Sequence, residues 1–221
     1  MAEKKFVSNK DECVPMFGNP ILEKLTHVHY TVPLIIFVPV IGYFLYKSVF
    51  ILQLGALSIF TYIIFGLSVW TMTEYVLHRF VFHWKPPGKW GERLHFIVHG
   101  VHHDYPSDSK RLVMVPSLSI PLAALFYFLF YIAFGPQHVA PFFVGFLSGY
   151  LFYDMTHYAV HHFNLKSKFW LELKHHHMIH HYKDDHNGFG VSSKFWDLVF
   201  RTMFDKKATS EKVSGQANQA S

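Results

Sequence analysis

Histidine is unusually frequent in this chain, and its spacing suits metal binding. The chain has 18 His among 221 residues. Residues i, i+3 and i+4 share one face of a helix, so His at that spacing direct two or three imidazoles to one point. Four groups of closely spaced His occur: His78-Arg-Phe-Val-Phe-His83, His95-Phe-Ile-Val-His99-Gly-Val-His102-His103, His157-Tyr-Ala-Val-His161-His162 and His177-Met-Ile-His180-His181.

Shared metal ions explain these groups better than isolated imidazoles do. Crowded imidazoles repel one another when protonated and leave buried polar groups unpaired when neutral, whereas neutral imidazole is a common metal ligand. A structural zinc site takes four ligands, fewer than the groups supply, so we expect two metals with about five His each. Imidazole suits zinc, iron, copper and nickel alike, so the ligand type alone leaves the metal open.

The first group differs from the others in its spacing. His78 and His83 are five positions apart, which is about 140° around an α-helix. One regular helix face therefore cannot present both side chains to one metal. We expect the helix to end or distort between them, before Pro86-Pro87-Gly88.

The composition indicates a membrane protein. Hydrophobic residues make up 51% of the chain, aromatic residues 19% and charged residues 16%, and the mean hydropathy is +0.16; a typical soluble domain is about 25% charged. The abundance of aromatics excludes a largely disordered chain. Cys13 is the single cysteine, so a disulfide scaffold and a thiolate-built metal site are excluded.

Uncharged stretches predict four membrane spans near Tyr30–Phe50, Leu54–Leu77, Pro116–Phe134 and Val139–Tyr158, because a spanning helix needs about 20 apolar residues. The last two lie in one long apolar stretch that Gly135-Pro136 interrupts. The expected fold is therefore an all-α integral membrane protein. Its four transmembrane helices form two hairpins, and a cytosolic helical cap carries the histidine-rich dimetal site.

The basic residues predict which side of the membrane the cap occupies. Every Lys and Arg except Lys47 falls in segments that the four-span layout places on one side, and the positive-inside rule makes that side cytosolic. We expect a cytosolic segment over 1–29, a membrane domain with its cap over 30–204 and a disordered tail over 205–221. The net charge of +5 then reflects contact with anionic headgroups rather than nucleic acid. The membrane is a bacterial inner membrane or the endoplasmic reticulum.

Two carboxylates stand in otherwise uncharged helices. Glu74 precedes His78 by four residues, and Asp154 precedes His157 by three. A metal-bound His commonly donates its second ring N–H to a carboxylate, and we expect Glu74 and Asp154 to orient ligands in this way. The alternatives are a salt bridge to Arg79 or Arg93, and direct ligation of a metal.

Several motifs together resemble the fatty acid hydroxylase superfamily, and within it the fatty acid 2-hydroxylases, or sphingolipid alpha-hydroxylases. The similarity extends from about Ser68 to Phe204 and is carried by ordered motifs: Glu74-Tyr-Val-Leu-His-Arg-Phe-Val-Phe-His83, His99-Gly-Val-His-His103, Tyr153-Asp-Met-Thr-His157, His177-x-x-His-His-Tyr182 and Gly188-Phe-Gly-Val-Ser-Ser-Lys-Phe-Trp-Asp197.

The resemblance implies a cytosolic dimetal centre, normally taken as non-haem diiron, although such sites can also hold zinc. The metal ligands that it implies are His78, His83, His99, His102, His103, His157, His161, His177, His180 and His181. We expect His95, His162, His175, His176 and His186 to support the site or lie at the surface, and His27, His29 and His138 to take no part. His176 stands where the family often has Tyr, and Arg201 where it often has Gly.

The implied activity is O₂-dependent hydroxylation of a long-chain fatty acyl group, at C-2, in sphingolipid synthesis. Tyr105, Tyr158 and Tyr182 follow ligand groups and are weak candidates for substrate contacts. No His-Pro-Gly-Gly haem motif of a fused b-type cytochrome is present, so we expect a separate electron donor, such as a small b-type cytochrome or a ferredoxin with its reductase. The alternatives are a sterol or carotenoid hydroxylase or desaturase, and a non-catalytic metal-binding or transport protein.

The segment after His177 is expected to cover the site as a lid. Apolar residues at three- and four-residue steps predict a short helix that lies in the membrane interface. They are Phe195, Trp196, Val199, Phe200 and Met203.

Overall fold

A computed structural model describes residues 6–204, and every regular element in this range is a helix. The predicted disordered tail at 205–221 lies outside the described residues. In chain order the elements are α1 (Pro20–Lys24), α2 (Val32–Tyr46), η1 (Lys47–Ile51), α3 (Ala56–Val76), η2 (Leu77–Phe82), α4 (Gly88–His95), η3 (Phe96–Gly100), α5 (Val101–Asp104), α6 (Pro116–His162), α7 (Lys168–Tyr182) and α8 (Phe195–Val199).

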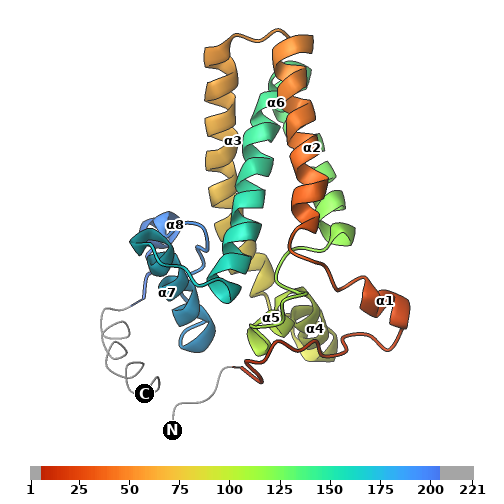
Figure 1. Cartoon of the computed structure of the whole chain (residues 1–221), viewed down its shortest axis with the longest axis vertical. Coiled ribbons are helices and arrows are strands. Elements are labelled where there is room, and N and C mark those ends of the chain that lie inside the picture. Colours follow the sequence, from red (N-terminus) through yellow and green to blue (C-terminus); the bar gives the residue numbers. More distant parts are fainter. Residues whose placement is uncertain (1–5, 205–221) are drawn as a thin grey trace.

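The helices divide into a tall column and a cap at one end of it (Figure 1). Helices α2, α3 and α6 stand side by side in the column, while α7 and α8 lie below on one side and α1, α4 and α5 on the other. The cap helices are short, and the column helices are long and apolar. This arrangement brings the cap against the lower ends of α3 and α6.

Within residues 6–204, three helical stretches are long and apolar enough to cross a membrane: Val32–Ile51, Ala56–Phe82 and Pro116–His162. The first joins α2 to η1 and the second joins α3 to η2 without interruption. Their bounds lie close to the predicted spans Tyr30–Phe50 and Leu54–Leu77. The all-helical class is confirmed, and the chain is a multi-pass membrane protein.

Helix α6 contains the interruption predicted at Gly135-Pro136. Gly135 has φ 72° and ψ 175°, which is not helical and is a conformation that glycine adopts at little cost. Twenty residues of straight helix would separate Phe126 from Phe146 by about 30 Å, yet their ring centroids lie 5.0 Å apart. The rings of Phe130 and Phe142 are similarly close, at 4.7 Å. The two halves of α6 therefore pack back to back, with the chain reversing at Gly135.

Helices α3 and α6 approach each other closely because glycines line their contact. A Cβ atom on Gly66 would lie 2.0 Å from the carbonyl oxygen of Phe142, and one on Gly145 would lie 1.9 Å from that of Ile63. Small residues commonly let membrane helices pack at such short range. The contact holds α3 and α6 together twelve residues before His78 on η2 and His157 on α6.

The segment before α2 follows the cap instead of standing apart from it. The amides of Val7 and Ser8 both donate to the carbonyl oxygen of Asp104, and the amide of Val28 donates to that of Lys110 at 2.9 Å. The described part of the predicted 1–29 segment is therefore attached to α5 and to the loop that follows it.

Candidate metal centre

A change in helix type brings His78 and His83 to the same side. The π-helix η2 covers Leu77–Phe82, and the amide of His83 donates to the carbonyl oxygen of His78, five residues back, at 3.3 Å. A π-turn bonds i to i+5, so it aligns residues that an α-helix would place about 140° apart. The predicted distortion is confirmed. The π-helix η3 carries His99.

The remaining pairs use ordinary helical spacing. His157 and His161 lie at the lower end of α6, and His177, His180 and His181 lie on α7. The Nε2 atoms of His177 and His181 are 3.0 Å apart.

The ten histidines that the resemblance implies form two groups of five. Within each group, the atoms offered as ligands lie within 4.8 Å of one another. Each group draws on several helices, so neither exists before the tertiary fold forms. Cluster A is His78, His83, His99, His103 and His180, and cluster B is His102, His157, His161, His177 and His181.

The contacts inside the clusters fit a cation better than a set of hydrogen bonds. The Nε2 atom of His99 lies 3.2 Å from that of His78 and 3.1 Å from that of His103. A neutral imidazole carries one N–H, which can serve only one of these contacts. His177 Nε2 is likewise 3.0 Å from Nε2 of both His161 and His181. Two nitrogens at right angles around a metal about 2.1 Å away would be about 3 Å apart, so a metal fits both clusters.

Burial keeps these rings in the form that binds metal. Because they are removed from water and lie beside other histidines, the pKa values of His99, His102, His103, His177 and His181 lie well below the usual range. Burial lowers the pKa of His180 to about 4. The rings are therefore neutral near pH 7, with a lone pair available on each.

Backbone carbonyls fix the orientation of three of the rings. His78 donates from Nδ1 to the carbonyl oxygen of Phe189 at 2.5 Å, His180 to that of Asn187 at 2.7 Å and His157 to that of Leu112 at 3.1 Å. In a neutral ring this leaves Nε2 unprotonated and directed into the cluster.

The predicted bonds from Glu74 and Asp154 to histidine are not what the structure has. Glu74 accepts from the amides of Val191 and Ser192, both at 2.8 Å, and from the Ser192 hydroxyl. Asp154 accepts from the amide of Met114 at 3.2 Å and from the Tyr150 hydroxyl. Each carboxylate instead accepts from a backbone amide two residues after a carbonyl oxygen that bonds a ligand histidine. Glu74 does so near the carbonyl oxygen of Phe189, and Asp154 near that of Leu112.

The alternatives for the two carboxylates are not seen among the described residues either. Arg79 donates to the Tyr75 hydroxyl and Arg93 to the carbonyl oxygen of Met16. Neither Glu74 nor Asp154 belongs to a metal-competent group.

Asp197 is a further buried carboxylate, for which the sequence alone predicted no role. It accepts from His176 Nε2 at 3.0 Å, from the amides of Phe189 and Gly190 and from the Thr202 hydroxyl. Burial opposes ionisation, but these hydrogen bonds lower the pKa of Asp197 overall. The sequence signal that could have identified Asp197 is its position as a single acidic residue within the otherwise apolar stretch Phe195–Phe200. His176, expected to support the site or lie at the surface, is buried and bonds Asp197.

The other seven histidines lie outside both clusters. His27 contacts Arg111, His29 contacts Thr31 and His138 stacks on Tyr62. His162 stacks on Tyr158, whereas His186 is exposed. His95 is half-buried and His175 is exposed.

An apolar cavity of about 500 Å³ reaches both clusters. Its lining includes His99 of cluster A together with His102 and His157 of cluster B. Apolar residues make up most of the remaining wall, and the segment Met16–Leu25 contributes four of them. Tyr105, Tyr158 and Tyr182, the weak candidates for substrate contacts, do not line it.

A second, more polar cavity of about 650 Å³ approaches the centre from another side. It is lined by His83 and His103 of cluster A, by His181 of cluster B, and by charged side chains such as Lys85 and Glu92. The two clusters are thus reached by one apolar and one polar route.

The predicted short helix after the fourth histidine group is α8, and its apolar side chains do not all share one environment. Trp196 donates to Thr71 at 3.0 Å and Phe200 stacks on Tyr75, so both contact α3. Phe195, Leu198 and Val199 remain exposed. The helix lies beside the lower end of α3 (Figure 1).

The fatty acid hydroxylase family model matches residues 63–202. The ceramide very long chain fatty acid hydroxylase scs7 of Schizosaccharomyces pombe is 40% identical over 193 residues, which cover 85% of this chain and 54% of that protein. The dihydroceramide fatty acyl 2-hydroxylase FAH1 of Arabidopsis thaliana is 37% identical over 183 residues, covering 82% of this chain and 76% of that protein.

A solved structure described as full-length scs7p, with only the hydroxylase domain visible, is similar to this fold. The TM-score is 0.77 at 41% identity, over 86% of this chain and 71% of that chain. The chain spans about half the length of the Schizosaccharomyces pombe scs7 protein and of its Saccharomyces cerevisiae counterpart, at 54% and 52%.

Proposed function

Because this chain belongs to the fatty acid hydroxylase family, we propose that it hydroxylates C-2 of a long-chain acyl group in sphingolipid synthesis. The family expected from the sequence motifs is confirmed. Relatives named as ceramide and dihydroceramide fatty acyl hydroxylases support this choice of reaction and substrate.

The contact between the apolar cavity and both clusters is the observation that carries the proposal. The cavity is lined by His99 of cluster A and by His102 and His157 of cluster B. A cavity of about 500 Å³ lies within the roughly 300–1,000 Å³ of small-molecule sites. A hydrocarbon chain in it would lie directly against the two metal positions.

The proposed metals are two iron ions, held by clusters A and B through the ten histidines. When bound, iron would supply the redox chemistry that activates O₂, which zinc lacks. The net reaction consumes one C–H bond, one O₂, two electrons and two protons, and yields one C–OH group and one water. O₂ is therefore a co-substrate, and the electrons require a donor.

The residues of this chain prepare the centre for that reaction. The carbonyl oxygens of Phe189, Asn187 and Leu112 hold three histidine rings with Nε2 directed inward. Glu74, Asp154 and Asp197 hold the backbone segments that carry or adjoin those carbonyls. The apolar wall excludes water from the acyl chain, and the polar cavity offers water and protons a separate approach.

An acyl amide suits the apolar cavity better than a free fatty acid. Among the described residues that line the cavity, Arg111 is the one with a permanently charged basic side chain. Its guanidinium already bonds to Glu23, Asp108 and the carbonyl oxygen of Val14. An incoming carboxylate would therefore have to displace an existing partner, whereas the amide of a ceramide carries no charge.

The proposed topology has four membrane spans, with the two halves of α6 as the last two. The cap, the metal centre and both termini then face the cytosol of a bacterial inner membrane or of the endoplasmic reticulum. The positive-inside rule supports this orientation, because the cap contains Lys85, Lys89, Lys110 and Arg111. The electron donor is proposed to be a separate b-type cytochrome, or a ferredoxin with its reductase.

Expression in a host that makes no 2-hydroxy lipids tests this function. The unaltered chain should produce 2-hydroxyacyl sphingolipids that lipid mass spectrometry detects, and His102→Gln should abolish them. His138→Gln is the matched control, since that histidine lies outside both clusters, and it should retain activity. Hydroxylated sterols or carotenoids, or new double bonds, would contradict the proposed reaction.

A further inference from the structure

One wall of the apolar cavity comes from a segment that the family model does not match. Met16, Phe17, Leu22 and Leu25 line the cavity, whereas the matched region begins at residue 63. The same cavity is also lined by the cluster histidines His99, His102 and His157. The space available to an acyl chain therefore depends on where the Met16–Leu25 segment is held.

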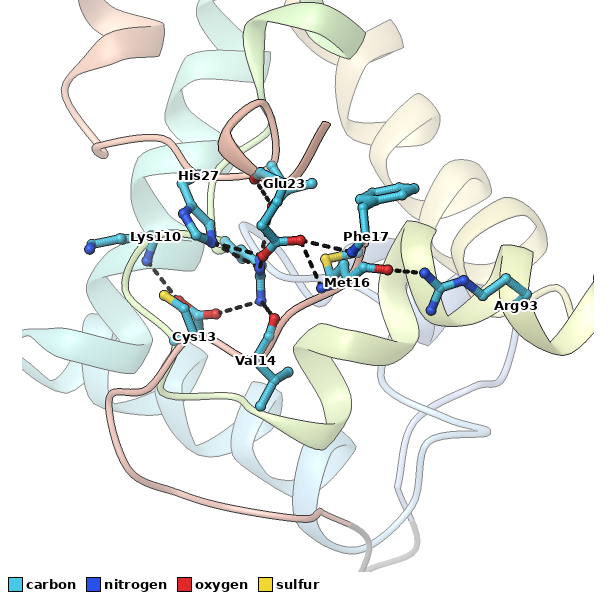
Figure 2. Close-up of polar contacts among 11 residues, drawn as sticks. Cys13, Val14, Met16, Phe17, Glu23, His27, Arg93 and Lys110 are labelled. Atoms are coloured by element: carbon cyan, nitrogen blue, oxygen red, sulfur yellow. Dashed lines mark hydrogen bonds and ion pairs between the residues drawn. The ribbon is translucent and has the colours of Figure 1, made fainter. Parts of the chain in front are cut away.

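Glu23 sets the shape of this segment. Its Oε2 atom accepts from the amides of Met16 and Phe17, both at 2.8 Å, and its Oε1 atom pairs with Arg111. Arg93 donates to the carbonyl oxygen of Met16 from the other side. Figure 2 shows Glu23 between these two amides and the polar groups of the loop before α6.

Arg111 attaches the segment to the rest of the cap. Its guanidinium donates to the carbonyl oxygen of Val14 at 2.6 Å, to Asp108 at 3.3 Å and to the Thr26 hydroxyl at 3.2 Å. The side chains of Arg111 and Asp108 are 4% and 2% exposed. Removing one partner of such a shielded ion pair is far more disruptive than removing a surface pair.

The mouth of the cavity is apolar and lies beside α1. Four apolar lining residues remain exposed and mark the opening, beside the exposed Ser117: Val98 39%, Leu22 47%, Leu118 49% and Leu25 54%. Helix α1 lies at the level of the cap, to one side of the column and below the lower end of α2 (Figure 1). An acyl chain leaving the bilayer would meet this opening before it reached the clusters.

We infer that the Met16–Leu25 segment is the substrate-selecting wall of the cavity, and that Glu23 and Arg111 are positioning residues that fix its distance from the cluster histidines. The inference rests on the proposed function for its ligand, an acyl chain. The sizes of the side chains at positions 22 and 25 determine which acyl chains fit. The Glu23–Arg111 pair determines how strictly they are selected.

Substitutions in α1 and at the residue that follows it test the wall. Leu22→Trp and Leu25→Trp add bulk to the cavity lining, and Ile21→Trp is the matched control because Ile21 is exposed and does not line the cavity. The readout is photocrosslinking of the full-length protein in lipid nanodiscs by a diazirine-bearing acyl amide. Because a hydrophobic pocket discriminates one methylene by roughly 10–200-fold, we expect at least about tenfold weaker labelling for the two lining variants.

The control should label within about twofold of the unaltered protein, a difference of under 1 kcal/mol. Leu22→Ala enlarges the same wall and should shift competition toward bulkier acyl chains, so a lining variant that fails to fold does not remove the test. Labelling of the Leu22 and Leu25 variants that matches the Ile21→Trp control would overturn the inference.

Glu23→Gln tests the positioning role, with Glu12→Gln as the control, because Glu12 is exposed and lies just before the Met16–Leu25 segment. Loss of the hydrogen bonds to a charged acceptor should make the amides of Met16 and Phe17 exchange at least about tenfold faster. The difference in labelling between acyl chains of different size should become smaller, while the metal content of the protein stays the same. Unchanged exchange and unchanged discrimination would refute the role.

The two proposals fail separately. If labelling depends on positions 22 and 25 but no 2-hydroxy product forms, the proposed function is contradicted and the substrate-selecting role of the Met16–Leu25 segment is supported. If 2-hydroxy products form and their distribution of chain lengths is the same in the lining variants as in the unaltered protein, only the substrate-selecting role of the segment is contradicted.

Discussion

Asp197→Asn should loosen one metal position while leaving the fold of the column intact. The side chain is fully buried and accepts from four donors: His176 Nε2, the Thr202 hydroxyl and the amides of Phe189 and Gly190. The single oxygen of an asparagine amide accepts two of them. The other two donors lose their acceptor at about 1–3 kcal/mol each, so the local cost is roughly 2–6 kcal/mol.

That cost falls on the loop that orients cluster A. The loop supplies the carbonyl oxygens of Phe189 and Asn187, which accept from His78 and His180. Weakening such outer contacts typically lowers metal affinity by about 10–100-fold. Cluster B has no ligand bonded to this loop among the described contacts, since His157 donates to the carbonyl oxygen of Leu112.

The assay is metal content measured against increasing chelator concentration, with purified protein in detergent. Asp197→Asn should lose its first equivalent of metal at about 10–100-fold lower chelator concentration and its second at the concentration found for the unaltered protein. Glu172→Gln is the control, because Glu172 is on α7 with the ligands yet its side chain is 55% exposed. Simultaneous loss of both metals, or no change in either, would refute the reasoning.

Three further predictions concern the column, the N-terminal segment and α8. Gly135→Ala should lower the free energy of unfolding by about 1–3 kcal/mol, the typical cost of a non-glycine residue in that backbone region, whereas Gly42→Ala, in α2 with open space around it, should not; equal unfolding midpoints would count against the turn at Gly135. Burial and the nearby Asp108 carboxylate raise the pKa of the Cys13 thiol to about 11. Alkylation of Cys13 should therefore be slow at pH 8, accelerate as the pH rises toward 11, and be faster in Asp108→Asn. An alkylation rate like that of a free thiol would contradict the contact between Cys13 and Asp108. Replacing Phe195 and Leu198 of α8 by Asp should reduce lipid hydroxylation without changing metal content, because both side chains are exposed apolar groups suited to the membrane interface; normal hydroxylation would argue against α8 as a membrane-contacting lid.

The spans and the histidine groups could be predicted because their signals are local. Long uncharged stretches and the Gly135-Pro136 interruption mark the column helices, and spacings of three and four residues place His157 with His161 and His177 with His181 on shared faces. The spacing of His78 and His83 predicted that the helix ends or distorts between them. The same spacing could not distinguish a helix end from the π-turn that the structure contains.

The contacts around the ligands could not be predicted because their acceptors are backbone groups. Every residue has a carbonyl oxygen, so nothing in the sequence singles out Phe189 or Leu112 as the partner of His78 or His157. For the same reason Glu74 and Asp154 were expected to bind histidine, although their partners are amides of distant segments. The cavity wall formed by Met16–Leu25 depends on ion pairs such as Glu23–Arg111, which join residues 88 positions apart.

The central claim is that two metal positions beside an apolar cavity insert oxygen into an acyl chain. The most direct test supplies isotopically labelled O₂ to the purified, iron-loaded protein with a ceramide and an electron donor, and locates the label by mass spectrometry. The account predicts one labelled oxygen in the product, on C-2 of the acyl chain, and none in His102→Gln. Oxygen derived from water, or label at another carbon, would contradict it.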